Sequence, residues 1–377
     1  MLLLSGPNIA GNEWKYVKDC LDTGWVSSVG AYVTQFENMV ADFAGCRYGV
    51  ATSNGTSALH IALMLAGVQA NDLVITPNVT FIATVNSIKY TGADPVLIDV
   101  DPKSWQMDLA VLENWLQQQT QTNDKGELIH TDSGRVVRAI MPVHVLGNMC
   151  NMDQLLSIAD KYKLPVVEDS TEALGSYYKG KHSGGFGKMG CFSFNGNKII
   201  TTGGGGVIVT DDEALAKKAK HLTTQAKSDA FEYIHDEVGY NYRLVNVLAA
   251  MGVAQMELLP SFIKRKKEID QFYRQQLTGV GDIRFQDVAD TVDANCWLFT
   301  FSTGKQKEVL RVLNENQMQS RPFWVPMNQL RMFAGDIYVS NNDQSNQVYQ
   351  QCLSIPCSTY IKDEELQAVA DKIKSVF

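Results

Sequence analysis

A single lysine, Lys198, stands where its amine could do chemistry. It lies in a polar turn between an apolar stretch, residues 191–194, and a glycine run, residues 203–206. A lysine held between buried strands is partly removed from water, which disfavours its charged form and makes the amine nucleophilic. Such a lysine can form a Schiff base, although a lone lysine in a hairpin loop is more often a surface residue. The glycine run lacks the Gly-Lys-Ser/Thr of a phosphate loop, so we interpret it as backbone freedom beside Lys198.

Two adjacent acids, Glu168 and Asp169, end an apolar strand that begins near residue 165. An unpaired carboxylate at such a buried position is costly, so we expect Asp169 to face a cation. The protonated nitrogen of a pyridine ring would supply that cation, and the aspartate would keep the ring an electron sink. A helix-capping acid is the competing interpretation.

Further candidates follow other apolar stretches. Small and hydroxyl-bearing residues at 52–58 open a helix, where free N–H groups suit a phosphate, and an ordinary N-cap explains them equally well. Phe81 could stack on a flat ring or fill the core. His144 ends a strand and could line the same pocket or be a structural histidine. Arg243, among the aromatics of 240–242, suits capture of a carboxylate or lies in a packing loop.

Short apolar runs alternate with amphipathic stretches of helix length between about residues 47 and 168. This alternation predicts crossover connections and a mainly parallel, doubly wound sheet with functional groups at the carboxyl ends of its strands. The polar residues 119–137 predict a loop or small hairpin. Helical periodicity predicts further helices at 11–21, 31–44, 212–225, 245–276 with an interruption at Pro260, and 363–376.

The length of 377 residues exceeds one ordinary core and predicts two domains. We expect residues 1–250, including an N-terminal helical segment, to form a large α/β domain. Residues 251–377 are expected to form a smaller α+β domain.

The composition excludes several classes of protein. A net charge of −8 without a Lys/Arg cluster disfavours binding to nucleic acid or to acidic membrane surfaces. We find no apolar run long enough to span a bilayer and no signal peptide in residues 1–7. The seven cysteines contain no CxxC pair and indicate reduced thiols, and no metal site is expected. A cytoplasmic location is therefore expected.

Taken together, the motifs resemble the DegT/DnrJ/EryC1/StrS family of sugar aminotransferases, which use pyridoxal 5′-phosphate (PLP) and have fold type I. The resemblance covers nearly the whole chain, and the motifs fall in family order. They are SNGTS at 53–57, TF at 80–81, ED at 168–169, FSFNGNK at 192–198 and GYNYR at 239–243. The fold implied is a three-layer α/β/α large domain with a mostly parallel sheet and a smaller α+β C-terminal domain.

The resemblance also implies roles for individual residues. Lys198 matches the catalytic Schiff-base lysine, and Asp169 matches the partner of the ring nitrogen. The other cofactor-binding matches are Phe81 on the ring face, Glu172 at the 3-hydroxyl, Thr56, Ser57 and Ser193 at the phosphate, and Asn241 at the phosphate from the neighbouring subunit. Substrate contacts are expected from Trp25, His144, Arg321 and Arg243, the last reaching the donor's carboxylate across the interface of a homodimer.

Within the family, residues 12–17, 22–28 and 132–135 resemble the branch that aminates C4 of a UDP-linked 4-keto-6-deoxy-N-acetylhexosamine. Products of that branch lead to sugars of the legionaminic acid or bacillosamine type. Two residues depart from the family pattern. Asn328 stands where the family usually has His, and Val245 where Ser or Thr is common.

The implied reaction is a ping-pong transamination, in which L-glutamate donates its amino group and Lys198 acts as acid and base. A 3-keto nucleotide sugar is an alternative substrate. Two other activities compete with this interpretation. A sugar dehydratase of the same fold would have His in place of Lys198, and a non-catalytic, PLP-binding regulatory protein would need neither Lys198 nor Asp169.

Overall fold

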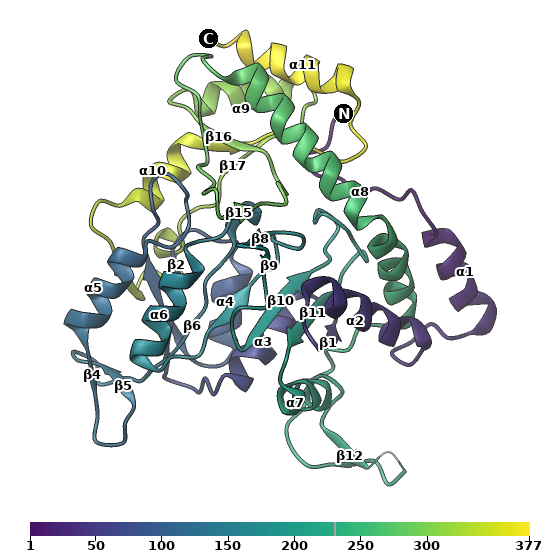
Figure 1. The fold of residues 1–377 in the computed structure, drawn as a ribbon, viewed down its shortest axis with the longest axis vertical. Coiled ribbons are helices and arrows are strands. Elements are labelled where there is room, and N and C mark those ends of the chain that lie inside the picture. The colour runs from purple at the N-terminus through teal and green to yellow at the C-terminus, as the bar shows by residue number, and fades with distance from the viewer. Residues whose placement is uncertain (230) are drawn as a thin grey trace.

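A computed structural model describes residues 1–229 and 231–377 (Figure 1). The larger part of the chain is built around a long sheet, and the smaller part lies beyond one end of it. Helix α8 (Asn246–Leu277) runs from one part to the other. Both termini lie in the smaller part, where Leu2 forms a parallel bridge with Met318.

Two four-stranded ladders make up the long sheet, and parallel bridges from Ile140 to Val166 and from Val143 to Asp169 join them. Among these strands only β11 runs antiparallel to its neighbours. The expected mostly parallel sheet is confirmed. In spatial order the strands are β1 (Tyr48–Thr52), β11 (Gly206–Thr210), β10 (Met189–Ser193), β7 (Val167–Asp169), β6 (Val137–Ile140), β2 (Leu73–Pro77), β3 (Asp94–Ile98) and β18 (Ile337–Val339).

Helices cover both faces of this sheet. Successive residues of a strand point to opposite faces, and in these strands the residues on both faces are apolar. In β11, Val207 and Val209 pack with α2 and α8, whereas Ile208 packs with α3 and α7. The three layers place every strand in a dry environment, as a parallel sheet requires. One face carries α2 (Ala31–Ala44), α5 (Leu109–Gln119), α6 (Met152–Tyr162) and α8, and the other carries α3 (Gly55–Leu65), α4 (Ala83–Tyr90) and α7 (Glu213–Thr223).

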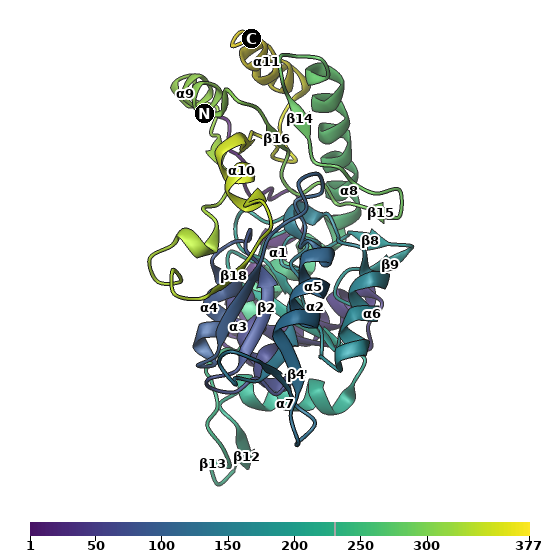
Figure 2. The same ribbon diagram turned by 90° about the vertical axis from the view of Figure 1, so that its left-hand side faces the viewer.

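The smaller part is an antiparallel sheet covered by helices, and Tyr273 and Phe301 lie in its core. Its strands are β14 (Arg284–Phe285), β16 (Thr300–Ser302), β19 (Cys352–Ser354) and β17 (Arg321–Pro322), and its helices are α9 (Gln306–Glu315), α11 (Asp363–Lys374) and the second half of α8. Figure 2 shows it seated above the sheet, while α10 (Gln344–Gln351) and β18 return to the larger part.

The remaining elements lie at the periphery. Helix α1 (Glu13–Thr23) packs on α8. The predicted excursion at 119–137 contains a hairpin, β4 (Thr120–Thr122) and β5 (Leu128–His130). A second hairpin, β12 (Lys227–Asp229) with β13 (Ile234–His235), projects away from the body in both views. A small sheet joins β8 (Tyr177–Tyr178), β9 (Lys181–His182) and β15 (Val292–Asp293), and short 3₁₀ turns span Val145–Gly147 and Met327–Gln329.

Three expectations about α8 need correction or comment. Pro260 does not interrupt the helix, which is continuous from Asn246 to Leu277. The predicted domain boundary at 250/251 therefore falls inside a helix. By length and composition α8 could also cross a membrane, contrary to the expectation that no run is long enough. Of its most apolar 18-residue stretch, 56% is buried inside the protein, so packing against α1 and α2 accounts for its hydropathy.

Candidate active site

A cavity of about 670 Å³ lies between the larger and smaller parts, at the carboxyl ends of β1 and β10. This is the edge where a parallel sheet usually presents its functional groups. Its lining residues are Leu4, Ser5, Asn54, Gly55, Thr56, Leu59, Phe81, Ala83, Thr171, Glu172, Ser193, Asn195, Asn197, Lys198, Trp297, Leu298, Gln319, Arg321, Pro322, Phe323, Trp324 and Ser354.

Lys198 reaches this cavity because β10 ends at Ser193 and the chain then turns. The Lys198 N–H donates to the carbonyl of Asn195 at 3.0 Å, which closes the turn. The indole Nε1–H of Trp297 donates to the carbonyl of Asn197 at 2.8 Å and fixes the turn from the other side of the cavity. Gly203, in the glycine run, has φ +81°, a backbone conformation that glycine adopts more easily than other residues. This agrees with the interpretation that the run supplies backbone freedom beside Lys198.

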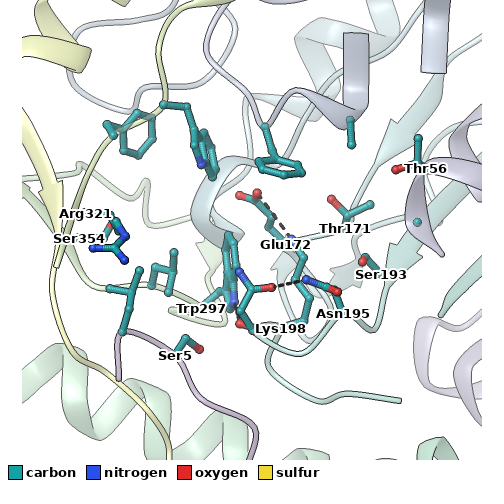
Figure 3. Close-up of a pocket in the computed structure, with 18 of the residues that line it drawn as sticks. Ser5, Thr56, Thr171, Glu172, Ser193, Asn195, Lys198, Trp297, Arg321 and Ser354 are labelled. Carbon is teal, nitrogen blue, oxygen red and sulfur yellow. Dashed lines mark hydrogen bonds and ion pairs between the residues drawn. The ribbon is translucent and has the colours of Figure 1, made fainter. Parts of the chain in front are cut away.

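The Lys198 amine faces one carboxylate and one indole (Figure 3). Its Nζ lies 3.7 Å from Oε1 of Glu172 and 4.0 Å from the centroid of the Trp297 ring. The side chain is 11% exposed. Burial lowers the pKa of Lys198, and the charges of Glu172 and Asp169 oppose that shift without cancelling it. A larger fraction of the amine is therefore neutral and nucleophilic than in a surface lysine.

Glu172 is buried and short of donors. Its Oε2 accepts the N–H of Leu146 at 2.8 Å, and its Oε1 faces Lys198. Burial raises the pKa of Glu172 to about 7, against the opposing effects of Lys198 and the Leu146 N–H. This carboxyl can therefore gain or lose a proton near neutral pH.

Asp169 lies behind the cavity at the end of β7 and is 2% exposed. The Thr84 hydroxyl donates to its Oδ2 at 2.7 Å, and the Thr171 N–H donates to its Oδ1 at 3.2 Å. Thr84 is in turn held by Thr80, 2.6 Å between hydroxyl oxygens. Within the described chain Asp169 has no lysine, arginine or histidine partner, which fits a cationic ring nitrogen as the missing partner. The sequence analysis did not identify Thr84.

One end of the cavity carries hydroxyls beside the N-terminus of α3. Thr56, Thr171 and Ser193 point into it, and Figure 3 draws no interaction between them. A Cβ on Gly55 would approach Cβ of Ser193 to 2.8 Å, so only glycine leaves this space open. Unpaired hydroxyls beside a helix N-terminus fit a phosphate. Ser57 does not line the cavity, because its N–H is capped by Asn54 Oδ1 at 2.8 Å and its hydroxyl lies 3.2 Å from that of Ser53.

The other end of the cavity is aromatic and cationic. Phe81 is 52% exposed, so it is not a core residue, and its ring lies 6.3 Å from that of Trp324. Arg321 and Ser354 lie across the cavity from the hydroxyls, with Lys198 between the two ends (Figure 3). An anionic ligand group could therefore be bound at each end.

Trp25, Asn241 and Arg243 also lie outside this cavity. Trp25 is 57% exposed in the loop after α1. Asn241 is exposed, and its backbone forms a β-bridge with Thr224. The backbone of Arg243 forms a β-bridge with Thr52, and its side-chain Nε is buried without a hydrogen-bond partner among the described residues. The roles of Asn241 and Arg243 across a dimer interface, and of Trp25 as a substrate contact, stay predictions.

The prediction of a substrate contact for His144 is corrected. This side chain is fully buried, and its Nε2 lies 2.9 Å from Oε2 of Glu168, so it has no access to the cavity. The end of a strand fixes where a residue lies but not the direction of its side chain. Asn328 also points elsewhere, since its Oδ1 accepts from Asn78 Nδ2 at 2.9 Å and its N–H donates to Asn78 Oδ1 at 2.9 Å.

Residues 7–374 match the model of the DegT/DnrJ/EryC1/StrS aminotransferase family. GDP-perosamine synthase of Caulobacter vibrioides is 38% identical over 337 residues, 88% of this chain and 86% of that protein. UDP-4-amino-4-deoxy-L-arabinose–oxoglutarate aminotransferase of Shewanella sediminis is 30% identical over 308 residues, 78% and 74% of the two chains. The fold is also similar to Spr1654 of Streptococcus pneumoniae, solved in its PLP form, with a TM-score of 0.88, 24% identity and coverage of 100% and 98%.

The fold and the cavity thus define an α/β enzyme with a nearly buried lysine between two ends that could each bind an anion. The chain belongs to the DegT/DnrJ/EryC1/StrS aminotransferase family. The expected family, fold type and PLP cofactor are confirmed. The residues present fit this cofactor. Lys198, whose pKa is lowered, fits its aldehyde, the buried Asp169 fits its ring nitrogen, and the hydroxyls beside α3 fit its phosphate.

Proposed function

We propose that this sugar aminotransferase moves the amino group of L-glutamate to the C4 keto group of a UDP-linked 4-keto-6-deoxy-N-acetylhexosamine. The observation that carries the reaction is the Lys198 amine, nearly buried, 3.7 Å from Glu172 and placed between the two ends of the cavity. It is the one lysine that lines the cavity in the described chain.

The chain's own groups divide the work. When bound, PLP supplies an electron sink for the carbon that loses a proton. Lys198 Nζ is placed to hold the cofactor's aldehyde and, when free, to take up and return that proton. Asp169 is placed to keep the ring nitrogen protonated, and Thr84 orients it through the 2.7 Å hydrogen bond. Glu172 stabilises the charged form of the lysine amine.

Support for the sugar comes from the relatives and from sequence motifs. One relative's name contains a 4-amino-4-deoxy sugar, which supports amination at C4. The motifs at 12–17, 22–28 and 132–135 resemble the branch that acts on UDP-linked N-acetylhexosamines. Arg321, the exposed Phe81 and the half-buried Trp324 offer a cation and aromatic faces for the nucleotide part of the substrate.

A GDP-linked keto-sugar is the second candidate. The observation that favours it is the 38% identity to a GDP-perosamine synthase, against 30% to the relative whose name contains UDP. A 3-keto nucleotide sugar is the third candidate.

We also propose that the active site is completed in a homodimer. The hairpin formed by β12 and β13 exposes Phe231, Tyr233 and Ile234, and Trp14 and Trp25 are exposed on and after α1. These exposed apolar side chains support the proposal, because contact with a second copy of the chain would bury them. Asn241 and Arg243, which the cavity of a single chain does not include, follow this hairpin in the sequence.

The test is incubation of the purified protein with PLP, L-glutamate and UDP-, GDP- and dTDP-linked 4-keto and 3-keto sugars. Mass spectrometry should detect the amino sugar and 2-oxoglutarate, with the UDP-linked 4-keto-N-acetyl substrate giving the largest kcat/KM. Fastest turnover of a GDP-linked or 3-keto sugar would reject the proposed substrate and leave the aminotransferase intact. Bleaching of the cofactor by glutamate without any sugar product from the panel would reject all three sugar candidates.

A further inference from the structure

Asn295 lies behind the cavity wall, in the irregular segment between β15 and β16. It is fully buried and is not among the residues that line the cavity. Its side-chain Nδ2 donates to the carbonyl of Glu172 and to the carbonyl of Leu174, both at 2.9 Å. Its Oδ1 accepts the N–H of Trp297 at 2.9 Å. Both amide hydrogens and the carbonyl oxygen of this side chain are therefore used.

The residues that Asn295 joins are the ones that flank the Lys198 amine. Glu172 follows β7 in the larger part, and Trp297 precedes β16 in the smaller part. Their side chains approach Nζ to 3.7 Å and 4.0 Å, the second measured to the ring centroid. One buried amide thus links the main chains of both neighbours of the reactive lysine.

The surroundings of Asn295 fix its own position. Its N–H donates to the Ser176 hydroxyl at 3.0 Å, and that hydroxyl donates to the carbonyl of Gly147 at 2.6 Å. A Cβ on Gly147 would lie 1.9 Å from Asn295 Oδ1, so the contact requires glycine. Cys296, between Asn295 and Trp297, has φ +55°, a costly conformation for this residue type. Such backbone strain persists only where surrounding bonds over-determine the geometry.

We infer that Asn295 is a positioning residue that holds Glu172 and Trp297 against the Lys198 amine without touching the cavity. Two further bonds complete the hold on Trp297. Lys266 Nζ donates to its carbonyl at 2.8 Å, and its own Nε1–H donates to Asn197. Side-chain directions set in this way decide how much water reaches Lys198, whichever sugar is the substrate.

The substitution Asn295→Asp tests this role because it keeps size and shape but replaces the two donated hydrogens by an oxygen that faces two carbonyls. Repulsion should move Glu172 and Trp297 apart and admit water to Lys198. The measurement is competitive labelling of the full-length, cofactor-free chain with acetic anhydride across pH, with the Lys198 peptide quantified by mass spectrometry. Since burial is the main cause of the lowered pKa of Lys198, its labelling midpoint should rise, by about one pH unit.

Gln306→Glu is the matched control. Gln306 is also a buried amide that donates to two carbonyls, those of Tyr349 and Cys352, both at 2.7 Å, and it does not line the cavity. The Gln306→Glu substitution should lower the midpoint temperature of thermal unfolding about as much as Asn295→Asp does. It should leave the pH midpoint of Lys198 labelling unchanged. Equal labelling midpoints in the two folded variants would overturn the inference.

A milder variant covers the case in which Asn295→Asp does not fold. Ser176→Ala removes only the hydroxyl that accepts the Asn295 N–H, and it should shift the Lys198 midpoint in the same direction by a smaller amount. A folded Ser176→Ala protein with an unchanged midpoint would then reject the positioning role.

Discussion

Glu168 and Glu172 are two buried carboxylates four positions apart, and the structure treats them in opposite ways. Glu168 is fully buried and accepts a hydrogen bond from His144. Burial acts to raise its pKa, but His144 and backbone N–H groups outweigh burial and hold the pKa of Glu168 below its usual value. The N–H donors are those of Gly184, Phe186 and Gly187, at 2.6 to 2.8 Å.

Glu172 is also buried, but among the described residues it has one N–H donor, Leu146, and its Oε1 lies 3.7 Å from the Lys198 amine. Its pKa rises to about 7, chiefly because of burial. The comparison shows that burial alone does not decide what a carboxylate does. A carboxylate that is surrounded by donors stays ionised and braces the loop after β9, whereas one left short of donors can exchange a proton with Lys198.

The largest expected effect comes from removing the amine that distinguishes the two sites. Lys198→Ala should lower kcat for transamination by about 10³-fold or more, because the chain loses its proton carrier and its attachment point for the cofactor. Steady-state turnover of glutamate with the accepted keto-sugar measures this effect. Lys188→Ala, a substitution outside the cavity, is the control and should retain activity. Near wild-type turnover of the Lys198→Ala protein would contradict the proposed function.

The next effect is on stability at the donor-rich site. Glu168→Gln places an amide NH₂ group close to the Gly184 N–H and removes the negative charge that His144 and the N–H groups stabilise. The free energy of unfolding should therefore fall by about 3 kcal/mol. Urea denaturation at pH 7 measures this difference. The exposed pair of Glu113 with Lys161 provides the control, since Glu113→Gln should cost less than about 1 kcal/mol. Equal losses in the two variants would remove the contrast between Glu168 and Glu172.

The smallest effect is a pH dependence at the donor-poor site. The folded pKa of Glu172, about 7, lies above its ordinary value of 4.5, so the native state binds the extra proton. Its contribution to stability is therefore fully present below about pH 4.5 and is lost as pH rises through 7. Glu172→Gln should consequently gain stability relative to wild type as pH rises from 5 to 8, by about 2.5 kcal/mol. Urea denaturation of both cofactor-free proteins between pH 5 and 8 measures this gain. A difference in the free energy of unfolding that does not change with pH would refute the raised pKa of Glu172.

Local patterns were sufficient for much of the fold and for part of the site. Short apolar runs predicted the strands, and the turn after β10 follows directly from the polar residues 195–198. Lys198, Phe81 and Thr56 follow strands and Ser193 ends one, and they reach the cavity because the sequence already located the carboxyl ends of those strands. The interruption at Pro260 was wrong, because tertiary packing along α8 outweighs the loss of one backbone hydrogen bond.

The groups around Lys198 and Asp169 could be found only in the folded chain. Trp297, Asn295 and Thr84 come from segments distant in sequence from residue 198, and no local pattern records that they meet there. The directions of side chains were equally hidden, since His144 and Glu172 both lie in segments that follow strands but only Glu172 turns toward the cavity. Residue types and their spacing were enough to identify the Lys198 amine and the edge of the sheet on which it lies. How dry that amine is, and which carboxylate it faces, depends on contacts between two parts of the chain that exist only after folding.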